Sequence, residues 1–176
     1  MVDSMKAIQF SSPGKPEYSD FPVPEPSGGE VLVRIEAVNT CPHWDMHLMN
    51  DEQMLPGMPL TYPYPVGQPG HEATGVVERV GAEVTDFTPG TRVAAWRDPG
   101  QDRPGSYAQY NVFDSDNLLE IPKDIDMTKV ASLELAMCVQ VSFDRLIVND
   151  QIREKRVAIS GLGPAGLVAM QLARAY

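Results

Sequence analysis

The chain of 176 residues has little cysteine, few cations and no long apolar run. Its two cysteines, Cys41 and Cys138, are too few for a disulfide framework and suit reduced thiols that pack or bind metal. Acidic residues outnumber basic ones 24 to 14, which gives a formal charge of −10 and no basic surface to attract nucleic acid or anionic lipid. No apolar stretch reaches the roughly 18 residues that span a bilayer, and residues 1–10 lack a signal-peptide pattern. We therefore expect a cytoplasmic protein without nucleic-acid or membrane partners.

Proline and glycine are abundant instead. The 16 prolines are nearly twice the average share of about 5% and, with 14 glycines, are scattered along the chain. Up to about Pro122 they separate short segments that alternate like half-buried strands, a spacing typical of a small β-sandwich or barrel. The expected strands are residues 31–38, Thr74–Val80, Thr91–Trp96, Ser106–Phe113 and Asn117–Ile121.

The pattern changes at about residue 126. Good helix formers from Thr128 to Val148 predict one long helix or two joined helices. The apolar run Val157–Ser160 is expected to form a strand, which leads into a glycine-rich turn and a second helix. The predicted parts are a β-rich domain at residues 1–125, linking helices at residues 126–153 and the start of an α/β domain at residues 154–176.

The glycine-rich turn fits the G-x-G-x-x-G pattern of dinucleotide-binding domains. Gly161 would permit the tight turn, Gly163 would let the backbone approach a pyrophosphate, and Gly166 would let the helix pack close to the strand. The N–H groups at the start of the helix would face the anion. An ordinary glycine-rich turn is the alternative. The acidic residue that distinguishes NAD from NADP is expected about 20 positions further on, beyond Tyr176.

A second group of residues is typical of a metal site. One cysteine and all three histidines fall within residues 41–71: Cys41, His43, His47 and His71. Pro42 suits the first position of a short helix, Pro42–Met49, which makes Cys41 its N-cap. A thiol at a helix N-terminus is biased toward thiolate, and thiolate with imidazole is a zinc-like ligand set.

These residues also have plainer interpretations. Cys41 could be a small buried thiol, and His47 could lie on a solvated helix face. Glu72 could pair with Arg79 or Arg92. The metal interpretation therefore depends on residues that the sequence alone does not bring together.

One long segment carries a resemblance to a known family. Residues 70–81 read Gly-His-Glu-Ala-Thr-Gly-Val-Val-Glu-Arg-Val-Gly, and the pattern continues through Val84-Thr85-Asp86-Phe87 to Pro89-Gly90-Thr91-Arg92-Val93. This segment resembles the zinc signature, and the hairpin behind it, of the medium-chain dehydrogenase/reductase family of alcohol, polyol and sugar dehydrogenases. The resemblance covers essentially the whole chain. It implies a GroES-like, partly open β-barrel followed by a Rossmann domain that begins with the glycine motif.

The resemblance also implies a role for each ligand candidate. Cys41 would be the first zinc ligand, His71 the second, and Glu72 a neighbouring carboxylate that can enter the metal shell during turnover. For the third ligand, Glu134 matches the polyol-type branch better than Cys138, which lies one helical turn later. Zinc would polarise an alcohol, and a hydride would pass to NAD or NADP.

The segment after Cys41 departs from the family pattern. Family members usually have an aspartate three residues after the cysteine and often a histidine five after it, whereas Asp45 and His47 each come one residue later. A one-residue insertion would keep Asp45 as support for a zinc ligand. Either His43 or His47 then relays the alcohol proton. The four-cysteine lobe that binds a structural zinc is absent from the sequence, so one zinc per chain is expected.

These observations predict a zinc- and NAD(P)-dependent oxidoreductase that acts on a small-molecule alcohol or carbonyl compound. We expect the chain to be part of a longer, homo-oligomeric enzyme, and to bind zinc without turnover on its own. A zinc-free quinone or enone reductase relative and a catalytically silent binding or assembly barrel are the alternatives. The proline-rich stretch Met49–Pro69 suits either a wall of the substrate pocket or a plain surface loop.

Overall fold

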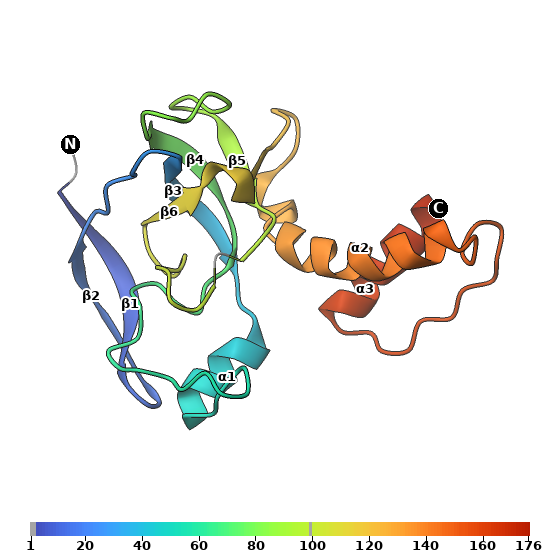
Figure 1. The fold of residues 1–176 in the computed structure, drawn as a ribbon, viewed down its shortest axis with the longest axis horizontal. Coiled ribbons are helices and arrows are strands. Elements are labelled where there is room, and N and C mark those ends of the chain that lie inside the picture. The colour runs from blue at the N-terminus through green and yellow to red at the C-terminus, as the bar shows by residue number, and fades with distance from the viewer. Residues whose placement is uncertain (1–2, 99) are drawn as a thin grey trace.

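The computed structural model describes residues 3–98 and 100–176, and shows a β-rich body from which two helices project (Figure 1). The strands are β1 (Ser4–Ser12), β2 (Lys15–Pro22), β3 (Glu30–Asn39), β4 (Glu72–Val80), β5 (Arg92–Ala95), β6 (Tyr110–Asp114) and β7 (Leu118–Glu120). They form the hairpin β1-β2 and an antiparallel five-stranded sheet in the order β6-β3-β4-β5-β7. A bridge between Ala7 and Ala108 joins the hairpin to the segment that leads into β6. The predicted mainly β, partly open barrel is confirmed.

The predicted strands are present with shifted ends. The largest shift is in Ser106–Phe113, where regular pairing begins only at Tyr110. The reason is that the backbone N–H groups of Ser106 and Tyr107 donate to the carbonyls of Gly70 and Gly67 instead of to a strand. β1 and β2 were not among the expected strands. Most of β2 is exposed, so it shows little of the alternation between buried and exposed residues that marks a half-buried strand.

The pairing of β3 with β4 determines where the functional residues lie. The two strands are antiparallel, and their register aligns Asn39 with Glu72. The chain that leaves β3 and the chain that enters β4 therefore lie at the same end of the sheet. Gly75 permits the close approach, because a Cβ at this position would lie 2.3 Å from the carbonyl oxygen of Arg34.

The main core lies between the strands of the larger sheet. Its buried residues are Val31, Val33, Ala73, Val77, Phe87, Val93, Ala95, Phe113 and Leu118. A bulge between Leu32 and Val33 interrupts the alternation expected in β3, so that three consecutive residues are buried there. A second cluster of Phe10, Leu48 and Tyr64 packs part of the Met49–Pro69 stretch against the barrel.

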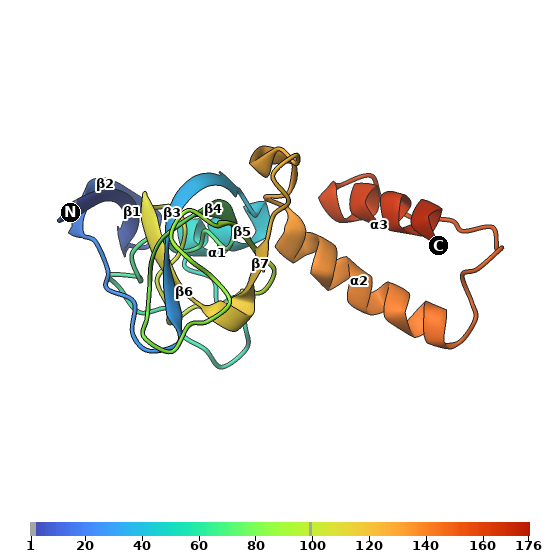
Figure 2. The same ribbon diagram turned by 90° about the horizontal axis from the view of Figure 1, so that it is seen from above.

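Three α-helices complete the described chain. They are α1 (Pro42–Asn50), α2 (Leu133–Val148) and α3 (Pro164–Ala175). The segment predicted from Thr128 contains a short 3-10 turn, Met127–Lys129, before α2, so the joined-helix alternative is correct. Helices α2 and α3 lie side by side in both views (Figures 1 and 2), and the ring of Phe143 stacks on that of Tyr176 at 6.2 Å. None of the helices in the described chain is both long and apolar enough to cross a bilayer.

The prediction of a strand at Val157–Ser160 is wrong for this structure. The segment has no regular secondary structure, and most of it is exposed. A strand needs a neighbour to accept and donate its backbone hydrogen bonds, and no described strand lies beside this segment. The helix predicted after the glycine motif is confirmed as α3.

Replacing Phe113 with alanine is expected to lower the free energy of unfolding by about 3–5 kcal/mol. Phe113 is 1% exposed in the main core, so its removal leaves a cavity between β3, β5 and β6. Urea denaturation followed by circular dichroism measures the change. Leu119→Ala on β7, where the leucine is 46% exposed, is the control and should stay within about 0.5 kcal/mol of the wild type. Equal effects of the two substitutions would contradict the assigned core.

Candidate metal centre

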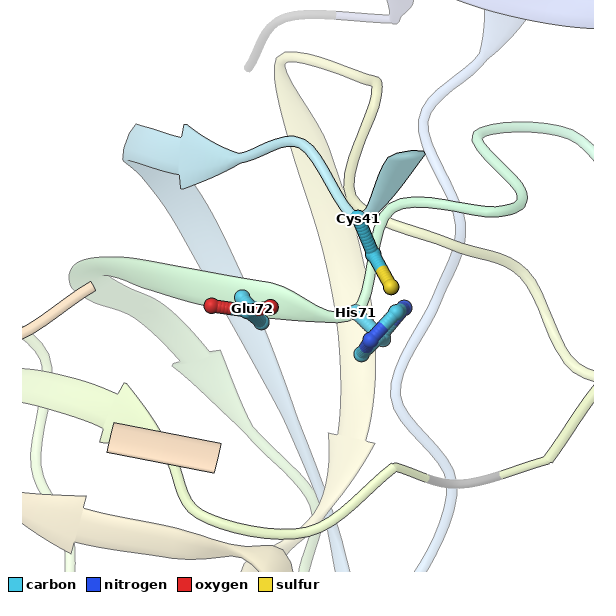
Figure 3. Close-up of side chains that lie close together, drawn as sticks. All are labelled: Cys41, His71 and Glu72. Carbon is cyan, nitrogen blue, oxygen red and sulfur yellow. The ribbon is translucent and has the colours of Figure 1, made fainter. Parts of the chain in front are cut away.

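Cys41, His71 and Glu72 form one cluster at the end of the sheet defined by the β3–β4 register. One potential ligand atom from each residue lies within 4.8 Å of the others, and Figure 3 shows Cys41 and His71 pointing toward one another beside Glu72. Cys41 follows β3 and is the N-cap of α1, as predicted, while His71 immediately precedes β4. His71 and Glu72 are buried, and Cys41 is half-buried. The cluster thus combines sulfur, nitrogen and oxygen donors from two adjacent chain segments.

The imidazole of His71 is oriented by its surroundings. Its Nδ1 lies 2.8 Å from the carbonyl oxygen of Pro69, which can only accept a hydrogen bond. In the neutral ring Nδ1 therefore carries the proton, and Nε2 keeps a lone pair available for a metal ion. The ring of Trp44 packs against that of His71, with centroids 4.9 Å apart.

Glu72 is a buried carboxyl group beside these donors. Burial raises its pKa, and His71 and Asn39 oppose the rise by stabilising the charged form. The side chain is 5% exposed. The alternative partners proposed from sequence have contacts elsewhere: Arg79 lies 3.0 Å from Glu25, and Arg92 donates to backbone carbonyls after β7.

The two candidates for a third ligand differ in their surroundings. Glu134, near the start of α2, has Oε2 3.8 Å from Nε2 of His71, and its side chain is 14% exposed. Cys138 is exposed and donates from Sγ to Oε1 of Glu134 at 3.2 Å. Burial of the sulfur and the nearby Glu134 carboxylate raise the pKa of Cys138 to about 11, which keeps the thiol protonated at neutral pH. These contacts favour Glu134.

Asp45 contacts a residue that the sequence did not indicate. Its two carboxylate oxygens accept a hydrogen bond from the Tyr107 hydroxyl at 3.0 and 3.2 Å. Burial raises the pKa of Asp45, and nearby His71 acts in the opposite direction. The Nδ1 of His71 is held by Pro69 rather than by Asp45. A backbone carbonyl carries no residue-type signal, and Tyr107 belongs to no metal-binding pattern, so neither partner could be predicted from the sequence.

The two candidate proton-relay residues are neighbours on α1. The rings of His43 and His47 meet edge to face with centroids 4.6 Å apart. His43 is exposed and lines a cleft, whereas Nδ1 of His47 lies 3.1 Å from the carbonyl oxygen of Glu52. His43 therefore faces the cleft directly, with His47 next to it.

The cleft connects the cluster with the glycine motif. It has a volume of about 390 Å³ and is lined by Asn39, Thr40, Cys41, Pro42, His43, Glu72, Ser132, Leu135, Pro164 and Ala165. Pro164 and Ala165 begin α3, so the N-terminus of this helix borders the cleft that contains Cys41 and Glu72. The Met49–Pro69 stretch contributes none of the lining residues.

Two of the three motif glycines meet a backbone requirement. Gly161 has φ +100°, in the left-handed region that favours glycine, and a Cβ on Gly166 would lie 2.1 Å from the carbonyl oxygen of Gly161. Gly163 is the N-cap of α3 and has open space around it. The turn therefore has the shape expected of the motif, while its role in binding a cofactor stays a prediction.

The donor set fits a zinc ion. Zinc in catalytic sites is bound by three protein ligands drawn from Cys, His and carboxylate side chains, with a further position left open. Cys41 lines the cleft, His71 belongs to the same cluster of donors, and Glu134 lies next to His71. The hydrogen bond from His71 to Pro69 is the outer contact that usually accompanies a metal-bound histidine.

Residues 27–123 match the family described as the alcohol dehydrogenase GroES-like domain. Because this match covers more than half of the chain, the chain belongs to that family, the catalytic-domain family of the medium-chain dehydrogenases/reductases. The family resemblance seen in the sequence is confirmed.

Curated relatives include dehydrogenases of more than one substrate class. An alcohol dehydrogenase of Rhizobium meliloti is 29% identical, over 98% of this chain and 55% of that protein. An L-threonine 3-dehydrogenase of Anaeromyxobacter dehalogenans is 34% identical, over 88% of this chain and 49% of that protein. The chain thus spans about half the length of the relatives it matches.

Solved structures show the same architecture. Galactitol-1-phosphate dehydrogenase from Escherichia coli superposes with a TM-score of 0.79 at 25% identity, over 97% of this chain and 53% of that one. A dehydrogenase from Sinorhizobium meliloti bound to NADP superposes with a TM-score of 0.76 at 26% identity, over 99% of this chain and 54% of that one. The similarity therefore extends through the barrel and both projecting helices.

Replacing Glu72 with glutamine is expected to stabilise the metal-free chain at pH 7 and to have little effect near pH 4. Since the folded-state pKa of Glu72 is raised above 4.5, the stability that its protonated form provides is present below that pH and is lost as the pH rises through the folded pKa. Glutamine stays neutral throughout. Each unit of pKa shift corresponds to about 1.4 kcal/mol in the free energy of unfolding.

Urea denaturation in the presence of a chelator measures this difference at both pH values. The control is Glu78→Gln at an exposed position on the same strand, which should change the free energy of unfolding by less than about 0.5 kcal/mol. If Glu72→Gln destabilised the chain more at pH 7 than at pH 4, the pKa of Glu72 would not be raised as described.

Proposed function

We propose that this chain is the metal- and substrate-binding part of a zinc-dependent, NAD(P)-linked alcohol dehydrogenase. The observation that carries the proposal is the cluster of Cys41, His71 and Glu72 at a cleft that also receives the start of α3. The relatives named as alcohol and threonine dehydrogenases support oxidoreductase chemistry, and the NADP-bound neighbour supports a nicotinamide cofactor. A zinc-free relative or a silent barrel has no need for a thiol and an imidazole of fixed tautomer in one cluster.

Cys41, His71 and Glu134 are the residues proposed to hold the zinc. When bound, zinc supplies Lewis acidity, which lowers the pKa of an alcohol and polarises a carbonyl group. The chain fixes the donors before the metal arrives: Cys41 by the N-cap of α1, and His71 by the hydrogen bond to Pro69. Glu72 provides a further donor that can enter the metal shell, because one of its carboxylate oxygens lies within 4.8 Å of the donor atoms of Cys41 and His71.

His43 and His47 are proposed to move the proton released by the alcohol. His43 lines the cleft, so its imidazole can accept a proton from a substrate there. His47 is in edge contact with His43 and is part-exposed, which gives the proton a path along α1 to solvent. The contact of His47 with the carbonyl of Glu52 holds its ring in place during this transfer.

Nicotinamide binding is proposed for the segment that begins with Gly161, Gly163 and Gly166. The free N–H groups at the start of α3 can bind a phosphate oxygen, and this end of the helix borders the metal cleft. A nicotinamide also needs a parallel sheet to hold it, and the described chain contributes only α3 beyond the motif. The metal cleft and a complete nucleotide-binding domain are both required to bring the hydride acceptor to the alcohol carbon.

The metal site is tested with Co²⁺, which reports a thiolate ligand by its charge-transfer absorption. We expect one equivalent of Co²⁺ or Zn²⁺ per chain and a thiolate band that Cys41→Ser removes. Cys41→Ser and His71→Ala should each weaken metal affinity by more than about 10–100-fold, which is the usual effect of losing a hydrogen-bond partner of a metal ligand. Glu134→Gln should also weaken binding.

Cys138→Ser is the matched control, because this thiol is exposed and bonded to Glu134. It should leave the stoichiometry and the thiolate band unchanged. If Cys138→Ser rather than Cys41→Ser abolished the band, the ligand assignment would be wrong, and if the wild-type chain bound no metal, the zinc-free alternative would replace the proposal.

The 176-residue chain is expected to show no alcohol-dependent reduction of NAD or NADP, even when loaded with zinc. The reason is that the described residues provide the metal cleft but little of the surface that would hold a nicotinamide ring beside it. The absorbance of NADH or NADPH at several alcohol concentrations provides the measurement. Sustained turnover by the zinc-loaded chain would show that these residues suffice for cofactor binding.

A further inference from the structure

Tyr107 contacts the segment that carries His71. Its backbone N–H donates to the carbonyl of Gly67 at 2.9 Å, and the N–H of Ser106 donates to the carbonyl of Gly70 at 2.7 Å. The approach is close, because a Cβ added to Gly70 would lie 2.6 Å from the backbone nitrogen of Tyr107. Residues 67–70 are thus packed directly against Tyr107, immediately before the histidine.

The side chain of Tyr107 contacts the segment that carries Cys41. Its hydroxyl donates to both carboxylate oxygens of Asp45, and the backbone N–H of Asp45 donates to the carbonyl of Cys41 at 3.1 Å. One tyrosine therefore reaches the N-cap and the first turn of α1.

We infer that Tyr107 is a positioning residue that sets the spacing between Cys41 and His71. This inference rests on the proposed metal site. Metal ligation tolerates deviations of only about 0.2 Å, so a contact that fixes two chain segments relative to each other affects affinity directly. The hydroxyl also explains how Asp45 is accommodated one residue later than the family pattern places it, because it gives the displaced carboxylate a half-buried hydrogen-bond donor.

Co²⁺ affinity and the Co²⁺ absorption spectrum of Tyr107→Phe test the inference. The substitution removes one oxygen and keeps the ring. We expect Co²⁺ binding to weaken about 10–100-fold, the range for loss of an outer contact, and the ligand-field bands of the bound ion to shift. Tyr110→Phe is the matched control, since this hydroxyl has no partner among the described residues, and it should change affinity less than about threefold.

A double-substitution cycle with Asp45→Asn separates positioning from general destabilisation. In the Tyr107→Phe background, Asp45→Asn should weaken Co²⁺ binding much less than it does alone, because the contact is already lost. Thermal unfolding of the metal-free variants shows that each is folded. If Tyr107→Phe does not fold, the affinity and spectrum of Asp45→Asn alone decide.

The outcomes distinguish this inference from the proposed function. A wild-type chain that binds no Co²⁺ would overturn both. The positioning role would be overturned, and the metal site left intact, if the wild-type chain bound Co²⁺ through Cys41 and Tyr107→Phe had the wild-type affinity and spectrum. If Tyr107→Phe does not fold, the same result for Asp45→Asn would overturn the positioning role.

Discussion

The antiparallel register that aligns Asn39 with Glu72 is the constraint on which the site depends. It brings Cys41, just after β3, and His71, immediately before β4, to the same end of one sheet, although the two residues are distant in the sequence. The register is held by the buried valines of both strands and by Gly75, where no side chain would fit. A shift by one residue would exchange the two faces of the strand and separate the thiol from the imidazole.

Around this constraint, neutral backbone groups orient the donors of the proposed metal site. The carbonyl of Pro69 fixes the tautomer of His71, and the N-cap of α1 presents the thiol of Cys41 at a helix terminus. Glu72 is buried and Asp45 is half-buried, and this burial raises the pKa of both carboxyl groups. Without a metal ion, desolvation destabilises the charged form of these carboxyl groups, and a bound cation would offset that free-energy cost.

The sequence allowed the barrel and the ligand candidates to be predicted because these features depend on local patterns. The G-H-E segment, the Pro42 helix start and the alternation in the strands each involve neighbouring residues. The contacts of Asp45 with Tyr107 and of His71 with Pro69 could not be predicted, since they depend on tertiary geometry and, in one case, on a carbonyl group. The strand predicted at Val157–Ser160 failed for a related reason: its apolar pattern suits a buried strand, yet pairing requires a neighbour that the described chain does not supply.

X-ray absorption at the zinc edge is the decisive measurement for the proposed ligand set, because it distinguishes sulfur from nitrogen or oxygen and gives the number of atoms in each shell. We expect one sulfur at about 2.3 Å, with the remaining nitrogen and oxygen ligands at about 2.0–2.2 Å, in a shell of about four atoms. A shell without sulfur, or one with two sulfur atoms, would rule out this ligand set.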